Sequence, residues 1–190
     1  MTTRIYGEPV QGLSAAGKPV TAGVFDEHQV RAAAGLTLVA GAVAFVYAYF
    51  GKEYLPIKAV TTLFFIEFAL RVGVGLRYSP FGQVARWLTR RRAPLWVSAQ
   101  PKRFAWTLGV VMSLAMTIIT NSNIRGTLPL TICMLCMTLM WLEAVLGLCL
   151  GCEIHGILVR RGWVARDASY EICASGACAA SPASEPAPGR

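Results

Sequence analysis

The chain has 190 residues, of which 55% are hydrophobic and 15% are charged, with a mean hydropathy of +0.50. An ordinary soluble domain carries roughly 25% charged residues. This composition argues against a water-soluble globule. The length suits one compact unit, or four spans of about 20 residues with loops, so a multidomain enzyme with a large soluble core is excluded.

Four segments are long and apolar enough to cross a hydrocarbon layer of about 30 Å as helices. The first, third and fourth are almost free of charge, and the second holds Glu67 and Arg71. The sequence therefore predicts an all-α protein, a four-helix transmembrane bundle over residues 31–162. The expected spans are 32–50, 59–75, 104–124 and 128–152.

The orientation follows from the basic residues of the short loops. Residues 77–103 hold seven lysines and arginines and no acid, whereas the two opposite loops carry only Lys52, Lys58 and Arg125. We expect residues 77–103 to be cytoplasmic, with both termini on that side and the protein in a bacterial inner membrane. Residues 1–30 do not resemble a cleavable signal and are expected to form a cytoplasmic arm. Residues 163–190 are expected to form a largely disordered, cysteine-containing tail.

The cytoplasmic loop has an amphipathic pattern. Phe81, Val84, Trp87 and Leu88 recur at helical spacing beside the basic residues Arg86, Arg90, Arg91 and Arg92. Such a helix lies on the inner leaflet and contacts anionic lipid headgroups. This interpretation explains the net charge of +8 better than nucleic-acid binding, and no nucleic-acid partner is expected.

Three ionisable residues fall at membrane depth, where charge is costly. Glu67 and Arg71 are four apart on one helix face, and Glu143 lies at a similar depth in the fourth span. We expect Arg71 to pair with Glu67 on its own helix and with Glu143 across the bundle. The favoured interpretation is a structural ion pair; the alternative is a polar site for a proton or an anion.

The six cysteines occur in three pairs. Cys133 and Cys136 lie well inside the fourth span and are interpreted as small apolar core residues. Cys149 and Cys152 fall at the inner surface, about 20 Å from the first pair along a rigid helix, so direct exchange between these two pairs is excluded. The third pair, Cys173 and Cys178, lies in the tail.

The pair Cys149 and Cys152 is the main candidate site. Thiols at the water interface can attack a disulfide, accept a sulfane sulfur or bind a soft metal, and Glu153 and His155 are possible proton partners. One feature opposes reactivity, because the carboxyl end of a helix disfavours a thiolate. With Cys173 and Cys178, the pair could instead supply four ligands to zinc or copper. A permanent disulfide is not expected in a reducing cytoplasm.

Several motifs together resemble a known family. They are Val24-Phe-Asp-Glu-His-Gln-Val-Arg31, Glu67-Phe-x-x-Arg71, Arg77-Tyr-Ser-Pro80, Pro101-Lys-Arg-Phe-Ala105 and Leu148-Cys-Leu-Gly-Cys-Glu153. The resemblance covers residues 24–161 and is to small bacterial integral membrane proteins catalogued as a domain of unknown function. It implies four helices and a Cys-x-Gly-Cys signature, and association with thioredoxin-like or rhodanese-like proteins. The chain departs from the family pattern at His155, where an aromatic residue is usual, and in its tail cysteines.

The leading hypothesis is a membrane thiol protein in which Cys149 and Cys152 handle disulfides or sulfane sulfur at the cytoplasmic face. No resident cofactor is expected, and no nucleotide loop, haem-attachment motif or serine nucleophile elbow is found. The sequence does not decide whether the protein is an enzyme. Two alternatives stay open, an accessory or scaffold subunit of a larger membrane complex and a cysteine-based metal module.

Overall fold

The computed structural model describes Gly7 and residues 13–15, 18–19, 23–164 and 181–182. Its elements are mostly helical and follow one another along the chain. They are β1 (Leu13–Ala15), β2 (Lys18–Pro19), β3 (Val24–Asp26), α1 (Glu27–Tyr49), α2 (Leu55–Gly73), the 3-10 helix η1 (Leu76–Tyr78), α3 (Pro80–Thr89), β4 (Trp96–Ser98), α4 (Ala99–Asn121), α5 (Thr127–Trp141), the π-helical turn η2 (Leu142–Leu146), α6 (Leu150–Arg160) and β5 (Ser181–Pro182).

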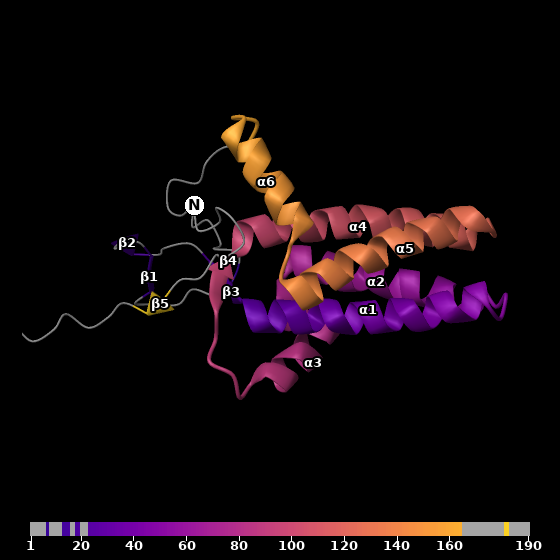
Figure 1. Cartoon of the computed structure of the whole chain (residues 1–190), viewed down its shortest axis with the longest axis horizontal. Helices are drawn as coiled ribbons and strands as arrows, with labels where there is room; N and C mark the ends of the chain where they lie inside the picture. Colours follow the sequence, from indigo (N-terminus) through magenta and orange to yellow (C-terminus); the bar gives the residue numbers. More distant parts are fainter. Residues whose placement is uncertain (1–6, 8–12, 16–17, 20–22, 165–180, 183–190) are drawn as a thin grey trace, which may run out of the picture.

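Helices α1, α2, α4 and α5 lie side by side in alternating directions, while α3 and α6 diverge from one end of this bundle (Figure 1). Helix α1 packs against α2 and α5, and α2 packs against α4, but α4 and α5 touch little along their length. Three segments are long and apolar enough to cross a membrane: 27–49, 99–121 and 127–146. These segments indicate a membrane protein.

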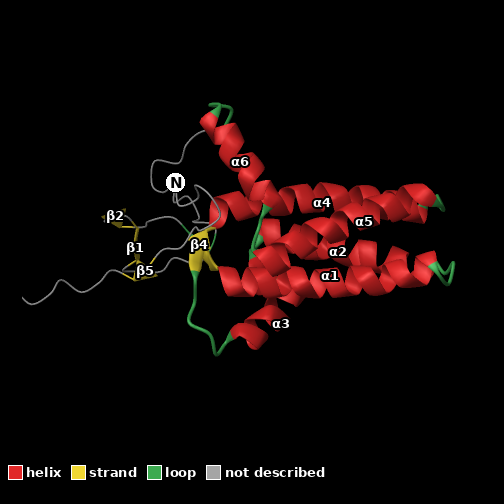
Figure 2. Ribbon diagram, in the orientation of Figure 1, coloured by secondary structure: helices red, strands yellow, loops and turns green. Residues whose placement is uncertain are grey.

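Strands β3 and β4 form an antiparallel pair at the end of the bundle where α3 and α6 diverge (Figure 2). Phe25 pairs with Val97, so the starts of α1 and α4 are joined side by side. Asp26 then begins α1, because its carboxylate accepts hydrogen bonds from the backbone N–H groups of His28 and Leu95 at 3.0 and 3.1 Å. The short strands β2, β1 and β5 form a second sheet.

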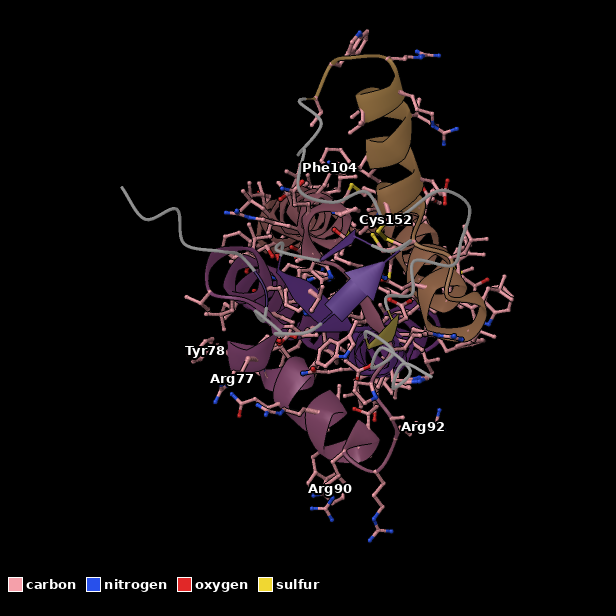
Figure 3. All side chains as sticks on the ribbon, turned by 90° about the vertical axis from the view of Figure 1, so that its left-hand side faces the viewer. Arg77, Tyr78, Arg90, Arg92, Phe104 and Cys152 are labelled. Atoms are coloured by element: carbon pink, nitrogen blue, oxygen red, sulfur yellow. A yellow bond between two sulfur atoms is a disulfide. The ribbon has the colours of Figure 1, made fainter. Side chains whose placement is uncertain are left out.

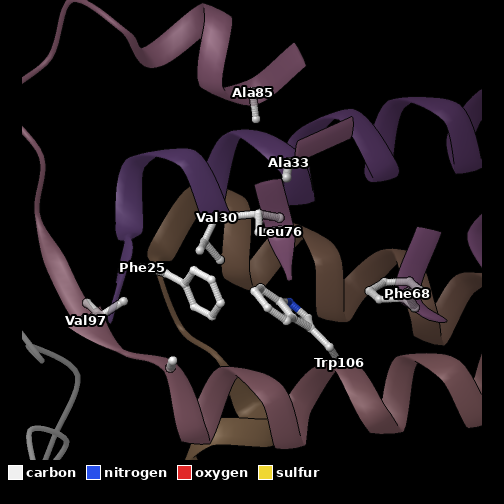
Figure 4. Close-up of a cluster of buried hydrophobic side chains, with 9 residues drawn as sticks. Phe25, Val30, Ala33, Phe68, Leu76, Ala85, Val97 and Trp106 are labelled. Carbon is white, nitrogen blue, oxygen red and sulfur yellow. The ribbon is translucent and has the colours of Figure 1, made fainter. Parts of the chain in front are cut away.

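The largest cluster of buried apolar side chains lies just inside this end (Figure 4). Phe25 of β3 packs on Trp106 of α4 with ring centroids 5.0 Å apart. The cluster is completed by Val30, Ala33, Phe68, Leu76, Ala85, Val97 and Ala99. A smaller cluster of Ala44, Ala48, Ile57 and Met116 fills the opposite end. Both ends of the bundle are therefore packed with apolar side chains.

The outer faces of the long helices are apolar. Val39 is 62% exposed, Val111 is 59% exposed and Leu135 is 53% exposed. A soluble monomer rarely exposes so continuous an apolar surface, whereas lipid-facing residues are expected to be apolar. The exposed apolar surface and the apolar composition thus both indicate a lipid environment.

Candidate functional site

The helix expected to run unbroken to Cys152 ends instead at a sharp break. The backbone widens into η2, and Gly147 then adopts a left-handed conformation with φ +71°. Glycine occupies this region without the steric cost that a Cβ would add. The side chain of Arg31 in α1 donates hydrogen bonds to the carbonyls of Ala144 and Val145. These acceptors would otherwise be exposed where the helix ends, so Arg31 stabilises the break.

This break reverses the expected environment of the cysteine pair. Cys149 is the N-cap of α6, and its sulfur accepts a hydrogen bond from the backbone N–H of Cys152 at 3.3 Å. The amino end of a helix favours a thiolate, whereas the carboxyl end disfavours it. The pair was expected at the carboxyl end of the fourth helix, where a thiolate is disfavoured. This prediction was wrong, because the structure places Cys149 at the amino end of α6.

Cys149 and Cys152 form a disulfide in this structure, with their Cα atoms 5.2 Å apart. The bond lies at the foot of α6, where Cys152 is labelled in Figure 3. Cys149 is buried, while Cys152 and Glu153 are half-buried. This turn therefore accommodates the oxidised pair.

Helix α6 packs closely against α4. A Cβ added to Gly151 would lie 2.6 Å from the Cβ of Ala105, so a larger residue would separate the two helices. One turn further, His155 packs on Phe104 with ring centroids 5.4 Å apart. Burial lowers the pKa of His155 below its ordinary value of 6.5. A lowered pKa keeps the imidazole neutral near pH 7, as a proton acceptor requires.

A buried cluster of three charges lies at the same end of the bundle. The Nζ atom of Lys102 in α4 lies 2.9 Å from Oε2 of Glu27 and 3.1 Å from Oε1 of Glu143. All three residues are buried. From the sequence, Lys102 was counted among the basic residues of the cytoplasmic loop, and Glu27 was not proposed as a site residue. Lys102 and Glu27 lie at the starts of α4 and α1, which the pairing of β3 with β4 brings together. A prediction of that strand pairing would have placed the two residues close to each other.

A buried ion pair lies near the carboxyl end of α2. Arg71 donates to Oε1 of Glu67 from Nε at 2.9 Å and from Nη2 at 2.7 Å. The other oxygen of Glu67 accepts the backbone N–H of Phe81 at 3.1 Å, which ties α3 to α2. The predicted pairing of Arg71 with Glu143 was wrong, because Glu143 pairs with Lys102 in the structure. The break in the fourth span places Glu143 beside α4 instead.

A cavity of about 180 Å³ runs between the bundle helices toward the cysteines. Its wall is almost entirely apolar and includes side chains of α1, α2, α4 and α5, among them Phe68, Met112 and Cys136. Glu143, Cys149 and Gly151 also belong to the wall. Glu143 and Cys149 therefore line the same cavity. Sequence reasoning missed it, because the periodicity of a helix says nothing of how closely two helices approach.

The arginines of the loop lie away from this site. Helix α3 rests on α1 through buried Gly82 and Ala85, and leaves Trp87 62% exposed. The guanidinium of Arg90 lies over the ring of Trp87, 5.6 Å from its centroid. In Figure 3, Arg90 and Arg92 point outward at the far side from Cys152. Arg86 and Arg91 are likewise exposed.

The remaining cysteines do not join the candidate site. Cys133 and Cys136 are half-buried free thiols within α5, and the Cys133 thiol lies 3.9 Å from the sulfur of Met137. Cys173 and Cys178, the other two ligands of the metal alternative, lie outside the described residues. Among the residues that the structure describes, no group of three or more histidine, cysteine or acidic side chains could hold a metal ion.

The comparisons with known proteins give one match. A family model described as Domain of unknown function (DUF4395) matches residues 25–160. The chain belongs to this family. The matched range begins in β3 and ends with α6, so the DUF4395 region contains both buried charge clusters, the cavity and the cysteine pair. No curated protein and no solved structure matches the chain.

Proposed function

We propose that this protein is a bacterial inner-membrane thiol protein whose Cys149 and Cys152 cycle between a dithiol and a disulfide at the cytoplasmic face. The observation that carries the proposal is the position of the pair, close enough to bond and placed at the amino end of α6. A short turn at a helix amino terminus suits both states, since it tolerates the disulfide and favours the thiolate.

In this proposal α1, α2, α4 and α5 all cross the bilayer. Helix α2 has 19 residues, packs between α1 and α4, and pairs its buried Arg71 with Glu67. The basic loop between α2 and α4 then faces the cytoplasm. Helices α3 and α6 diverge from that end and would lie along the membrane surface, where Trp87 and the neighbouring arginines contact lipid headgroups.

The partner in this cycle is a thioredoxin-like or rhodanese-like protein. A thiolate of a partner attacks the disulfide at the more accessible sulfur, that of Cys152, and forms a mixed disulfide while Cys149 leaves as a thiolate. The second partner thiol then attacks the mixed disulfide and releases Cys152. Two electrons and two protons pass from the partner, which ends as a disulfide, to the Cys149 and Cys152 pair. A partner persulfide would instead transfer its outer sulfur to a reduced thiolate of the pair.

The test uses thiol alkylation in intact cells. In a variant whose other four cysteines are serine, we expect diamide to protect Cys149 and Cys152 from a membrane-permeant maleimide, and dithiothreitol to restore their labelling. The matched control keeps only Cys133 and Cys136, which have the same spacing inside a regular helix and should stay alkylatable.

Two results would contradict the proposal. If Cys149 and Cys152 remain fully alkylatable after oxidant challenge, the pair does not cycle. If a membrane-impermeant maleimide added from the periplasm labels Cys152 in intact cells after dithiothreitol treatment, the proposed orientation is reversed.

A further inference from the structure

The two sulfurs of the pair face different surroundings. Cys149 is buried and belongs to the wall of the apolar cavity, whereas Cys152 is half-buried and does not line it. A water-soluble protein partner reaches the more accessible sulfur. The other sulfur is presented to a compartment that excludes water-soluble oxidants such as charged disulfides or nicotinamide nucleotides. Electrons could therefore enter from a protein partner at Cys152 and leave to an apolar oxidant at Cys149.

We propose that the cavity binds the ring of a lipid-soluble quinone, which oxidises the reduced Cys149 and Cys152 pair. This inference rests on the thiol cycle proposed above and supplies its electron acceptor. The cavity volume is about 180 Å³. An apolar protein cavity of about 150 Å³ stays dry and holds benzene, so this space has room for a six-membered ring. The wall of Phe68, Met112 and Met140 offers the aromatic and sulfur contacts that such a ring favours.

The cavity also has an opening suitable for a long apolar tail. Leu108, Leu150 and Ile154 belong to its wall and are 40%, 45% and 39% exposed. These side chains lie on α4 and α6, and α4 makes few contacts with α5. In a membrane this opening meets lipid, so a quinone would enter sideways and leave its tail outside. A water-soluble ligand would have to cross the same apolar surface.

The reaction balances without another reactant. The two thiols lose two electrons and two protons and form one S–S bond, and the quinone gains both electrons and both protons as its two carbonyl oxygens become hydroxyl groups. Glu143 lies in the same wall as Cys149 and is held by Lys102 at 3.1 Å. Because Glu143 lines the same cavity, we assign its carboxylate the role of passing a proton between Cys149 and the quinone.

The experiment uses the full chain, purified in detergent, reduced with dithiothreitol and desalted without air. The probe is a fully substituted benzoquinone with a decyl chain, which has no free ring carbon for thiol addition. We expect one quinol for each chain, measured by ultraviolet absorbance, together with loss of two alkylatable thiols at positions 149 and 152. Cys149→Ser should abolish this quinol formation.

Two neighbouring residues of α4 provide a matched test of the cavity. Met112 lines the cavity, whereas Val111 is 59% exposed and does not. Met112→Trp fills the space and should slow quinol formation by about tenfold or more, while Val111→Trp should remain within about twofold of the wild type. Both variants should be reduced by dithiothreitol at the wild-type rate, which shows that they fold and that the disulfide remains accessible.

The outcomes separate the two proposals. If the reduced protein forms quinol no faster than Cys149→Ser, or if both tryptophan variants slow it equally, the quinone site is wrong. If oxygen reoxidises the pair as fast as the quinone does, and Met112→Trp changes neither rate, the cavity is not an electron-acceptor site. In each case, a pair that still cycles with diamide and dithiothreitol leaves the proposed thiol function standing.

Discussion

Replacing Lys102 by methionine removes the ammonium group that lies between Glu27 and Glu143. Both carboxylates are buried, and the ammonium is 2.9 Å from one and 3.1 Å from the other. Methionine has a similar length and fills the same space, so the change removes charge with little change in packing. The two acids would then face each other without the cation and would have to take up protons or admit water.

The magnitude follows from the burial of the cluster. Removing one partner of a buried ion pair costs about 3–5 kcal/mol, because the remaining charge is left uncompensated. Here two carboxylates lose the same partner, while protonation relieves part of the penalty. We therefore expect Lys102→Met to lower the free energy of unfolding by about 3 kcal/mol at pH 7.5.

The assay is unfolding by sodium dodecyl sulfate in mixed micelles, followed by tryptophan fluorescence. Lys58→Met is the matched control, since its ammonium is exposed and bonds only to Oδ1 of Asn123 among the contacts described, at 2.8 Å. An exposed contact of this kind is worth about 0–1 kcal/mol. A triple variant, Glu27→Gln, Lys102→Met and Glu143→Gln, removes all three charges and should recover at least half of the lost stability.

The reasoning is refuted if Lys102→Met is destabilised no more than Lys58→Met. It is also refuted if the triple variant is less stable than Lys102→Met, because neutral side chains at all three positions leave no buried charge to compensate. Either result would mean that the cluster is hydrated in the membrane protein.

Three further predictions concern the second ion pair, the helix break and α6. Arg71→Met should lower the free energy of unfolding by about 3–5 kcal/mol in the same assay, and adding Glu67→Gln should restore part of it; unchanged stability would contradict the pairing. Gly147→Ala places a Cβ at φ +71° and should cost about 1–2 kcal/mol, whereas Gly73→Ala, with open space around it, should be neutral or stabilising. His155→Phe should reduce the loss of the free energy of unfolding as the pH falls from 7 to 5. A variant that loses stability as steeply as the wild type would contradict this prediction.

The sign of the His155 effect follows from its burial. Burial against Phe104 lowers the pKa of His155 below 6.5, so the folded chain binds fewer protons than the unfolded chain in this range. Stability therefore rises with pH through the interval just below 6.5 and is lost as the pH falls. Phenylalanine cannot take up the proton, and it keeps the contact with Phe104.

Much of the helical framework could be predicted from the sequence, because span length and charge spacing are local properties. The spacing of four between Glu67 and Arg71 places both on one helix face, and the structure brings them into contact. The amphipathic pattern of residues 81–88 likewise matches α3, which leaves Trp87 exposed beside Arg90. Each of these features depends on residues within one or two helical turns.

The candidate site depended on contacts that no local pattern contains. The apolar run from 128 to 152 reads as one helix, since a single glycine inside an apolar helix is tolerated. The break at Gly147 is stabilised by Arg31, more than 110 positions earlier, which donates hydrogen bonds to the carbonyls of Ala144 and Val145. The environment of Cys149 and the partner of Glu143 both follow from that long-range contact.

The break at Gly147 joins features that would be separate on a straight helix. Widening of the backbone over η2 turns Glu143 toward Lys102, and the left-handed residue then redirects the chain so that Cys149 caps a new helix. On a regular helix, Cys149 would lie about 120° around the axis from Glu143, at 100° per residue, and would therefore be on a different face. In the structure both side chains line one cavity. The break at Gly147, stabilised by Arg31, therefore brings a buried acid and a cysteine of the disulfide to the wall of the same cavity.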